Sequence, residues 1–359
     1  VITDTEILQY SDEELGDILK KEDVLFARTP SDQKLRITEI LQKNGEIVAM
    51  TGDGVNDAPA LKKADIGVAM GERGTEVAKE AADMILLDDN FASIVAAIQE
   101  GRTVYFNIKK FVTYILSSNM PEIIPYVLWF FLAIPLPLTV IQVLSIDLGT
   151  DLIPALALGA EEPEEDIMDR PPVGKNERIL DREVFKRGYG FLGIIEAAAA
   201  MTGFLGFLFL TGWTYGDLNI SALYHQQAMT MTLFGAIFCQ IANAWTLRTW
   251  TFPSYKKGFF SNKMLLAGIA VEVILMVLFL TAAPVQFVFE TAFVPPQYLL
   301  ILVPFPIVLY LGHELYKYWV RRNERTENHD ILNYPHPRRR RVRGRVSADD
   351  PPEGKEKEG

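Results

Sequence analysis

Hydrophobic and polar positions divide the chain into two parts with different patterns. Residues 1–100 contain short, continuous apolar runs that are separated by helix-like stretches and followed by polar or glycine-rich residues. Short buried strands that alternate with helices predict a parallel α/β sheet, whose functional loops lie beyond the carboxyl ends of the strands. The four expected strands cover residues 24–27, 47–50, 66–70 and 84–87.

Beyond residue 100, the chain has three long stretches without lysine or arginine. They cover 111–169, 188–247 and 264–316, and are 59, 60 and 53 residues long. Each stretch can hold two membrane helices of about 20 residues joined by a turn. We therefore expect an all-α membrane domain of six transmembrane helices, at roughly 111–134, 138–160, 189–212, 226–247, 264–284 and 298–318.

The basic residues lie between these pairs of helices and at both ends of the region. By the positive-inside rule, we expect a multi-pass integral membrane protein of a plasma or cell membrane, with both termini of the chain cytoplasmic. Buried core helices of a large soluble protein are the alternative, but they would not distribute lysine and arginine loop by loop. A helix over 88–110 should run from the α/β part directly into the first span.

Charge and composition exclude several classes of function. The net charge of −11 argues against a nucleic-acid partner, and the single Cys239 excludes a disulfide framework. Residues 323–359 are poor in apolar side chains and predict a disordered tail, either simply solvated or attracted to anionic lipid through its arginine run. Because the chain begins with Val1 and has no signal peptide, we expect it to start within a larger protein.

The expected strand at 47–50 leads into residues 51–61, TGDGVNDAPAL. Two glycines flank Asp53 and allow a tight turn, while Pro59 suits the first turn of a following helix. Asp53 and Asp57, four residues apart, offer the oxygen ligands that Mg²⁺ takes together with phosphate oxygens. An ordinary hydrogen-bonded turn with a helix cap explains the same spacing equally well.

Residues 51–61 resemble the signature of the P-type cation-transporting ATPases, whose phosphorylation domain is haloacid-dehalogenase-like. Residues 26–34, FARTPSDQK, resemble the segment of that family whose lysine contacts the aspartyl-phosphate. The resemblance implies that 1–100 is the C-terminal part of this α/β domain, with Mg²⁺ as cofactor and ATP as substrate. It makes Lys34 the phosphate contact and Asp53 the Mg²⁺ ligand, with Asn56 and Asp57 supporting the phosphate site.

The resemblance extends to about residue 322 and includes the stalk and membrane domain, 101–322. The family's phosphorylated aspartate lies in an Asp-Lys-Thr-Gly-Thr motif, which does not occur in this sequence. The resemblance therefore implies an ion-translocating ATP hydrolase only together with the N-terminal part of the same pump. We expect this chain alone to be inactive.

Acidic and amide side chains recur within the first two expected spans. Asn119 and Glu122 are three residues apart, and Thr150 and Asp151 follow Asp147 by three and four residues, so each group should share one helix face. No lysine or arginine lies in the same pair of helices, so ionised acids need a bound cation or a proton. Protonated acids hydrogen-bonded between helices are the structural alternative.

Residues 118–122 and 146–151 resemble ion-binding segments of the second large class of P-type pumps. Gln240 and Asn243 align with family positions that contribute to ion binding, and Glu272 resembles a position tied to an additional sodium site. Polar residues in membrane helices also serve only to hold helices together, which leaves the role of these three open.

The resulting prediction is the C-terminal portion of an ATP-driven pump for Na⁺/K⁺-type monovalent cations in a lipid bilayer. Asp147 favours this ion class, because calcium pumps typically carry asparagine at the matching position. A Ca²⁺ pump is the first alternative, and a membrane-anchored haloacid-dehalogenase-like phosphatase is the alternative of another class. The absence of a nucleophilic aspartate motif argues against the phosphatase, and an accessory subunit stays an open question.

Overall fold

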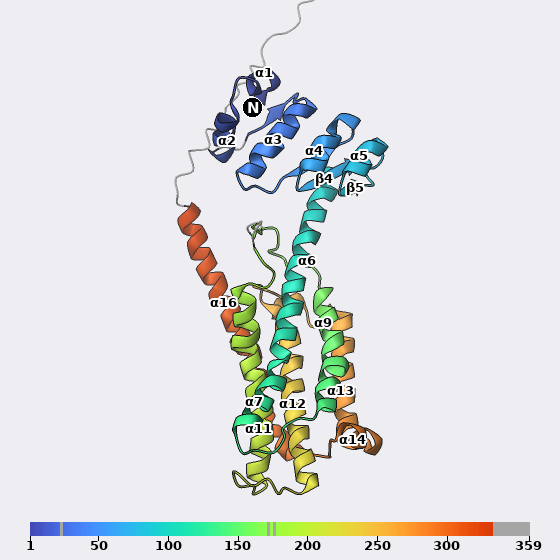
Figure 1. Ribbon diagram of the computed structural model, residues 1–359, viewed down its shortest axis with the longest axis vertical. Helices are drawn as coiled ribbons and strands as arrows, with labels where there is room; N and C mark the ends of the chain where they lie inside the picture. Colours follow the sequence, from blue (N-terminus) through green and yellow to red (C-terminus); the bar gives the residue numbers. More distant parts are fainter. Residues whose placement is uncertain (22–23, 171–172, 175–176, 333–359) are drawn as a thin grey trace, which may run out of the picture.

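The computed structural model describes residues 1–21, 24–170, 173–174 and 177–332. Figure 1 shows an α/β part at one end, a helical bundle at the other, and the helix α6 (Phe91–Ser118) running between them. Residues 323–332, predicted as the start of a disordered tail, are instead helical, because α16 (Pro304–Leu332) continues through them. Residues 333–359, the rest of that expected tail, lie outside the described residues.

The α/β part contains two small parallel sheets. β1 pairs with β2, and β4 lies between β3 and β5, with Val68 opposite Met84 and Thr51. The four expected parallel strands are therefore present: β4 has the predicted bounds, β3 lies two residues later than predicted, β2 and β5 are shorter, and β1 is an addition. The elements are β1 (Ile2–Thr3), α1 (Asp4–Ile7), α2 (Asp12–Lys21), β2 (Phe26–Ala27), α3 (Ser31–Lys43), β3 (Ala49–Gly52), η1 (Val55–Asp57), α4 (Ala58–Lys63), β4 (Ile66–Met70), α5 (Glu76–Ala81) and β5 (Met84–Leu86).

α6 connects the last strand to the bundle without a break. The side chain of Asn90 caps its first turn by accepting the N–H of Ala92 at 3.0 Å, and Ile94 packs against Val68 and Leu86 of the sheet. The helix has 28 residues, a length of about 42 Å. A single continuous helix therefore links the sheet to residues 114–118.

The bundle is built from long apolar helices joined by shorter pieces. Its elements are α7 (Met120–Phe131), α8 (Val140–Ser145), η2 (Ile146–Asp151), α9 (Leu152–Gly159), α10 (Arg182–Phe185), η3 (Lys186–Gly193), α11 (Ile194–Leu210), α12 (Ala222–Thr246), η4 (Ser254–Lys257), α13 (Lys263–Thr281), α14 (Ala283–Phe289), α15 (Pro296–Leu299), η5 (Leu300–Leu302) and α16. Figure 1 places α12 inside the bundle, among α6, α11 and α13.

Five helical stretches in the described part of the chain are long and apolar enough to cross a membrane. They are Val140–Gly159, Arg182–Leu210, Ala222–Thr246, Lys263–Thr281 and Pro296–Asn323. The expected first span, 111–134, is instead divided between α6 and α7 at Asn119. Pro121 lies in the first turn of α7, and proline has no N–H with which to continue the helix ladder.

Small residues let α11 and α12 approach each other closely. A Cβ atom on Gly235 would lie 2.7 Å from the backbone of Ala199, and one on Gly203 would lie 2.6 Å from the carbonyl oxygen of Met231. Phe204 and Phe234 fill the core beside these contacts. Close backbone approach through small residues is typical of helix packing in membranes.

A buried ion-pair cluster joins α6 to two loops at the end of the bundle nearest the α/β part. Glu164 is 3% exposed and lies 3.0 Å from the ammonium of Lys110 and 2.5 Å from the guanidinium of Arg170. It also accepts the N–H of Trp250 at 2.8 Å. Burial alone would raise the pKa of Glu164, but Lys110 and Arg170 outweigh it and hold that pKa below its ordinary value of 4.5.

Replacing Glu164 by glutamine should destabilise the full-length protein by about 3–5 kcal/mol, because Lys110 is left buried without its carboxylate. Thermal unfolding in detergent measures this loss. A carboxyl whose pKa is lowered on folding contributes stability above its unfolded pKa and loses it on acidification. The difference between wild type and variant should therefore be full at pH 7 and shrink below a pH of about 4.5.

The matched control is Glu165→Gln, because Glu165 is the exposed neighbour of Glu164. We expect this variant to unfold like the wild type. Equal melting of the Glu164 variant and the wild type at pH 7 would show that the cluster contributes no stability.

Candidate functional site

The turn after β3 is held in a defined shape by Gly52 and Asp57. η1 follows Gly54 and leads directly into α4. A Cβ atom on Gly52 would lie 2.6 Å from the Cβ of Asp57, so only glycine allows this close approach. The N–H of Thr75 donates to the carbonyl of Asp53 at 2.8 Å and ties the turn to the loop after β4.

Asp57 and Lys34 form the ion pair of this turn. Asp57 is 7% exposed, and its Oδ1 accepts the Nζ of Lys34 at 2.9 Å and the Oγ of Ser31 at 3.1 Å. Desolvation would raise the pKa of Asp57, but Lys34 and Ser31 outweigh it and lower that pKa below its ordinary value. The structure therefore brings together two of the four predicted residues as a charged pair beside the strand end.

Asp53 and Asn56, the other two predicted residues, are exposed at the same turn. Across the described residues, neither side chain forms a hydrogen bond within the chain. Mg²⁺ retains waters and takes one or two carboxylates together with phosphate oxygens. A solvent-facing carboxylate fits this requirement, and because Asp57 is already paired with Lys34, Asp53 is the better ligand.

Inside the bundle, Asp151 is the centre of a group of acids. It is 2% exposed, and its Oδ1 accepts the hydroxyl of Tyr114 at 3.2 Å. Its Oδ2 has no hydrogen-bond partner in the described part of the chain. Glu122 and Glu272, both predicted site residues, are also buried and interact electrostatically with Asp151.

Asp147, Thr150 and Asp151 all lie in η2, a π-helix whose i→i+5 hydrogen bonds widen the turn relative to an α-helix. Thr150 and Asp151 are buried, whereas Asp147 is exposed. That these three side chains act together on one helix face stays a prediction. Asp147 still interacts electrostatically with Asp151 and Glu122.

The remaining predicted residues come from three further places. Gln240 and Asn243 on α12 are fully buried, and the hydroxyl of Thr150 donates to Gln240 Oε1 at 3.4 Å. Glu272 on α13 is fully buried, and both of its oxygens are without a partner among the described residues. Asn119, at the junction of α6 and α7, is half-buried.

These side chains do not form a complete metal site by themselves. Among the residues that the structure describes, no three His, Cys, Asp or Glu side chains are grouped closely enough to hold a metal ion. The binding of a transported cation at these residues therefore stays a prediction.

Three residues in this region were not predicted. Glu196 on α11 is fully buried and accepts a hydrogen bond from Asn243 at 2.7 Å, and Asn243 also donates to Ser117 at 2.6 Å. Tyr114 binds Asp151 as described above. Glu196 could have been found as an acid within the stretch 188–247, which has no lysine or arginine. Ser117 and Tyr114 carry no comparable signal in the sequence.

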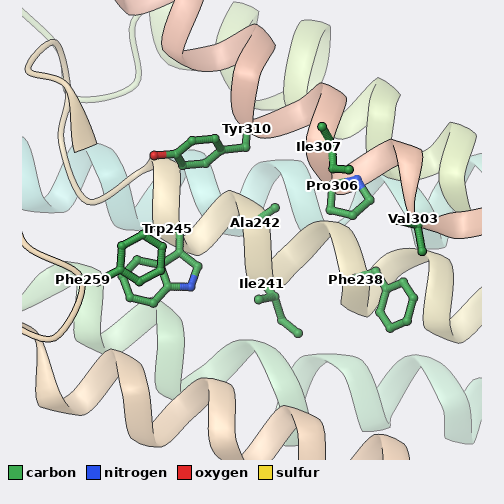
Figure 2. Close-up of a pocket in the computed structure, with 9 residues that line it drawn as sticks. All are labelled: Phe238, Ile241, Ala242, Trp245, Phe259, Val303, Pro306, Ile307 and Tyr310. Atoms are coloured by element: carbon green, nitrogen blue, oxygen red, sulfur yellow. The ribbon is translucent and has the colours of Figure 1, made fainter. Parts of the chain in front are cut away.

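An apolar pocket lies on a different face of α12, between this helix and α16 (Figure 2). Phe238, Ile241, Ala242 and Trp245 line it at helical spacing, whereas Gln240 and Asn243 belong to the buried polar face. Tyr310 and Phe259 close one end of the pocket in Figure 2. Because no charged residue lines it, this pocket is separate from the acids of the bundle.

Comparisons with known proteins agree with this division of the chain. Residues 135–319 match the family model "Cation transporting ATPase, C-terminus", and residues 34–98 match the model of haloacid dehalogenase-like hydrolases. The sodium/potassium-transporting ATPase subunit alpha-3 of Gallus gallus is 38% identical over 351 residues, which cover 90% of this chain and 35% of that protein.

Two further relatives have similar names. The potassium-transporting ATPase alpha chain 1 of Xenopus laevis is 37% identical over 350 residues, or 90% of this chain and 34% of that protein. The sodium/potassium-transporting ATPase subunit alpha-1 of Oreochromis mossambicus is 49% identical over 220 residues, or 61% of this chain and 22% of that protein. This chain therefore spans about a third or less of the length of these relatives.

The family model covers more than half of the chain, and both halves of the structure carry the side chains that the resemblance implied. The chain belongs to the P-type cation-transporting ATPase family.

Proposed function

We propose that this chain is the C-terminal part of an ATP-driven pump that moves Na⁺/K⁺-type monovalent cations across a membrane through an aspartyl-phosphate cycle. The observation that carries the proposal is the continuity of α6, which is separated from the end of β5 by four residues and runs to Ser118, beside the buried acids. The names of the relatives support the ion class. Hard oxygen ligands also suit Ca²⁺, which is therefore the alternative cargo.

In the α/β part, Lys34 would offset negative charge on the transferring phosphoryl group, with its ammonium oriented by Asp57 at 2.9 Å. Asp53 and Asn56 would face the phosphate from the exposed side of the same turn. Mg²⁺ bound at Asp53 supplies charge neutralisation for phosphoryl transfer, where positioning and electrostatics provide most of the catalysis. The phosphorylated aspartate would come from the N-terminal part of the pump.

In the membrane part, Asn119, Glu122, Asp147, Thr150 and Asp151 would bind the transported cations. Gln240, Asn243 and Glu272 would extend this set from α12 and α13. The exposed Asp147 would face helices supplied by the rest of the pump. α6 and α7 together would make a sixth crossing, and an even number of crossings would leave both ends of the chain on the same side of the membrane. In the proposed pump, that side is the cytoplasm and the membrane is a plasma membrane. Domain movement after phosphorylation would be transmitted along α6 and alternate the access to the site.

Phosphoenzyme formation from radiolabelled ATP in the purified full-length protein tests the ion class. We expect acid-stable labelling with Na⁺ and Mg²⁺ and without Ca²⁺. Labelling that needs micromolar Ca²⁺ and is indifferent to Na⁺ would favour the Ca²⁺ pump. Residues 1–359 alone, treated in parallel, should stay unlabelled because their sequence contains no Asp-Lys-Thr-Gly-Thr motif.

A further inference from the structure

Glu196 is a buried acid outside the set of residues that the resemblance implied. It lies in the first turn of α11 and is 0% exposed. Its Oε1 accepts the Nδ2 of Asn243 at 2.7 Å, and its Oε2 has no partner among the described residues. A carboxylate in such a place requires a positive partner or a proton.

Asn243 and Ser117 extend this contact to α6. The Nδ2 of Asn243 donates both to Glu196 and to the Oγ of Ser117, at 2.7 and 2.6 Å. Both amide N–H groups are therefore used, while the Oδ1 of Asn243 is an acceptor without a partner in the described part of the chain. The two free acceptors at this contact are oxygens, which are the ligands that hard cations prefer.

Among the residues that the structure describes, no basic side chain forms an ion pair or hydrogen bond with Glu196. The charged residues that act on it electrostatically are Asp151 and Glu122, which are both acids. The connection to Asp151 is also structural, because Ser117 donates to the carbonyl of Tyr114 at 2.8 Å and the Tyr114 hydroxyl binds Asp151. One turn of α6 thus contacts both carboxylates.

The packing of α11 on α12 fixes this arrangement. Gly235, two turns before Asn243 on α12, lies against the backbone of Ala199, one turn after Glu196 on α11, so the two helices are in close backbone contact on one side of the Glu196–Asn243 hydrogen bond. The oxygens are therefore held in place by closely packed backbones before any ion binds, which lowers the cost of ordering them.

We propose that Glu196 is a cation-binding residue, and that its carboxylate with the oxygens of Asn243 and Ser117 forms a site for a monovalent metal cation next to Asp151. The negative charge of this site comes from Glu196 on α11, because Asn243, the residue on α12 that contacts it, is neutral. The inference rests on the proposed function as a cation pump and names a residue that binds its cargo.

The test uses the full-length pump and measures radioactive sodium occluded per phosphoenzyme, together with the Na⁺ concentration that gives half-maximal phosphorylation. The variants are Glu196→Gln, the exchange Glu196→Gln/Asn243→Asp, and the control Glu290→Gln at an exposed position. We expect Glu196→Gln to occlude one ion fewer or to need at least tenfold more Na⁺. The exchange should restore the wild-type values, because it places the carboxylate on the other side of the same 2.7 Å contact.

A Glu196→Gln variant with normal ion number and Na⁺ dependence would overturn the inference, as would an exchange variant that stays as defective as the single variant. If Glu196→Gln is not recovered as folded protein, the exchange variant decides alone: wild-type values support the site and reduced occlusion rejects it. A wild-type protein whose phosphorylation ignores Na⁺ would instead reject the proposed function, and this inference with it.

Discussion

Replacing Asp53 by asparagine in the full-length protein should lower the phosphoenzyme formed from ATP at least about 100-fold, the effect typical of losing one electrostatic contact to a transition state. The substitution removes the negative charge that would hold Mg²⁺. The turn itself should survive, because the carbonyl of Asp53, not its side chain, accepts the N–H of Thr75.

Asp17→Asn is the matched control, since Asp17 is an exposed residue of α2. Its phosphoenzyme level and Mg²⁺ dependence should equal those of the wild type. Normal labelling of Asp53→Asn with unchanged Mg²⁺ dependence would show that Asp53 is only a turn residue.

The second large effect is expected at Asp151. Asp151→Asn should raise the cation concentration needed for phosphorylation at least about 30-fold, because removing one partner of a buried charge pair costs about 2–5 kcal/mol. The carboxamide keeps the shape of the side chain and can still accept the Tyr114 hydroxyl. The measurement is cation-dependent labelling by ATP, compared with labelling by inorganic phosphate, which should persist because the α/β site is unchanged.

Asp217→Asn, in the exposed loop between α11 and α12, provides the matched control and should behave like the wild type. Loss of labelling by both ATP and inorganic phosphate in Asp151→Asn would indicate a folding defect. Unchanged cation dependence would remove Asp151 from the binding site.

The fold could be predicted from the sequence where apolar runs recur along the chain or where lysine and arginine are absent over long stretches. Alternating apolar runs predicted the parallel strands, and the lysine- and arginine-free stretches predicted the long apolar helices. The expected first span is divided at Asn119 because Pro121 interrupts the backbone hydrogen bonding of the helix there. A hydropathy pattern contains no information about such an interruption. The extension of α16 to Leu332 was missed because composition alone favoured a disordered tail from residue 323 onward.

Motifs with their own signature supplied the candidate residues Lys34 and Asp57, but the ion pair between them was not predicted. Contacts between helices leave no such signature in the sequence. Asp147 is exposed although Asp151, four residues later in the same π-helix, is buried, and nothing in the spacing of 146–151 distinguishes a π-helix from an α-helix. Glu196 contacts Asn243 only because α11 packs against α12. This packing is tertiary structure, which the sequence pattern does not show.

ATP-driven uptake of radioactive sodium into proteoliposomes that contain the full-length protein tests the central claim most directly. The account predicts uptake that requires ATP and Mg²⁺, disappears in Asp53→Asn, needs a much higher Na⁺ concentration in Asp151→Asn, and is unchanged in Asp17→Asn. Uptake of calcium in place of sodium would contradict the assigned ion class, and the absence of any ATP-dependent cation movement by a folded, full-length protein would contradict the account as a whole.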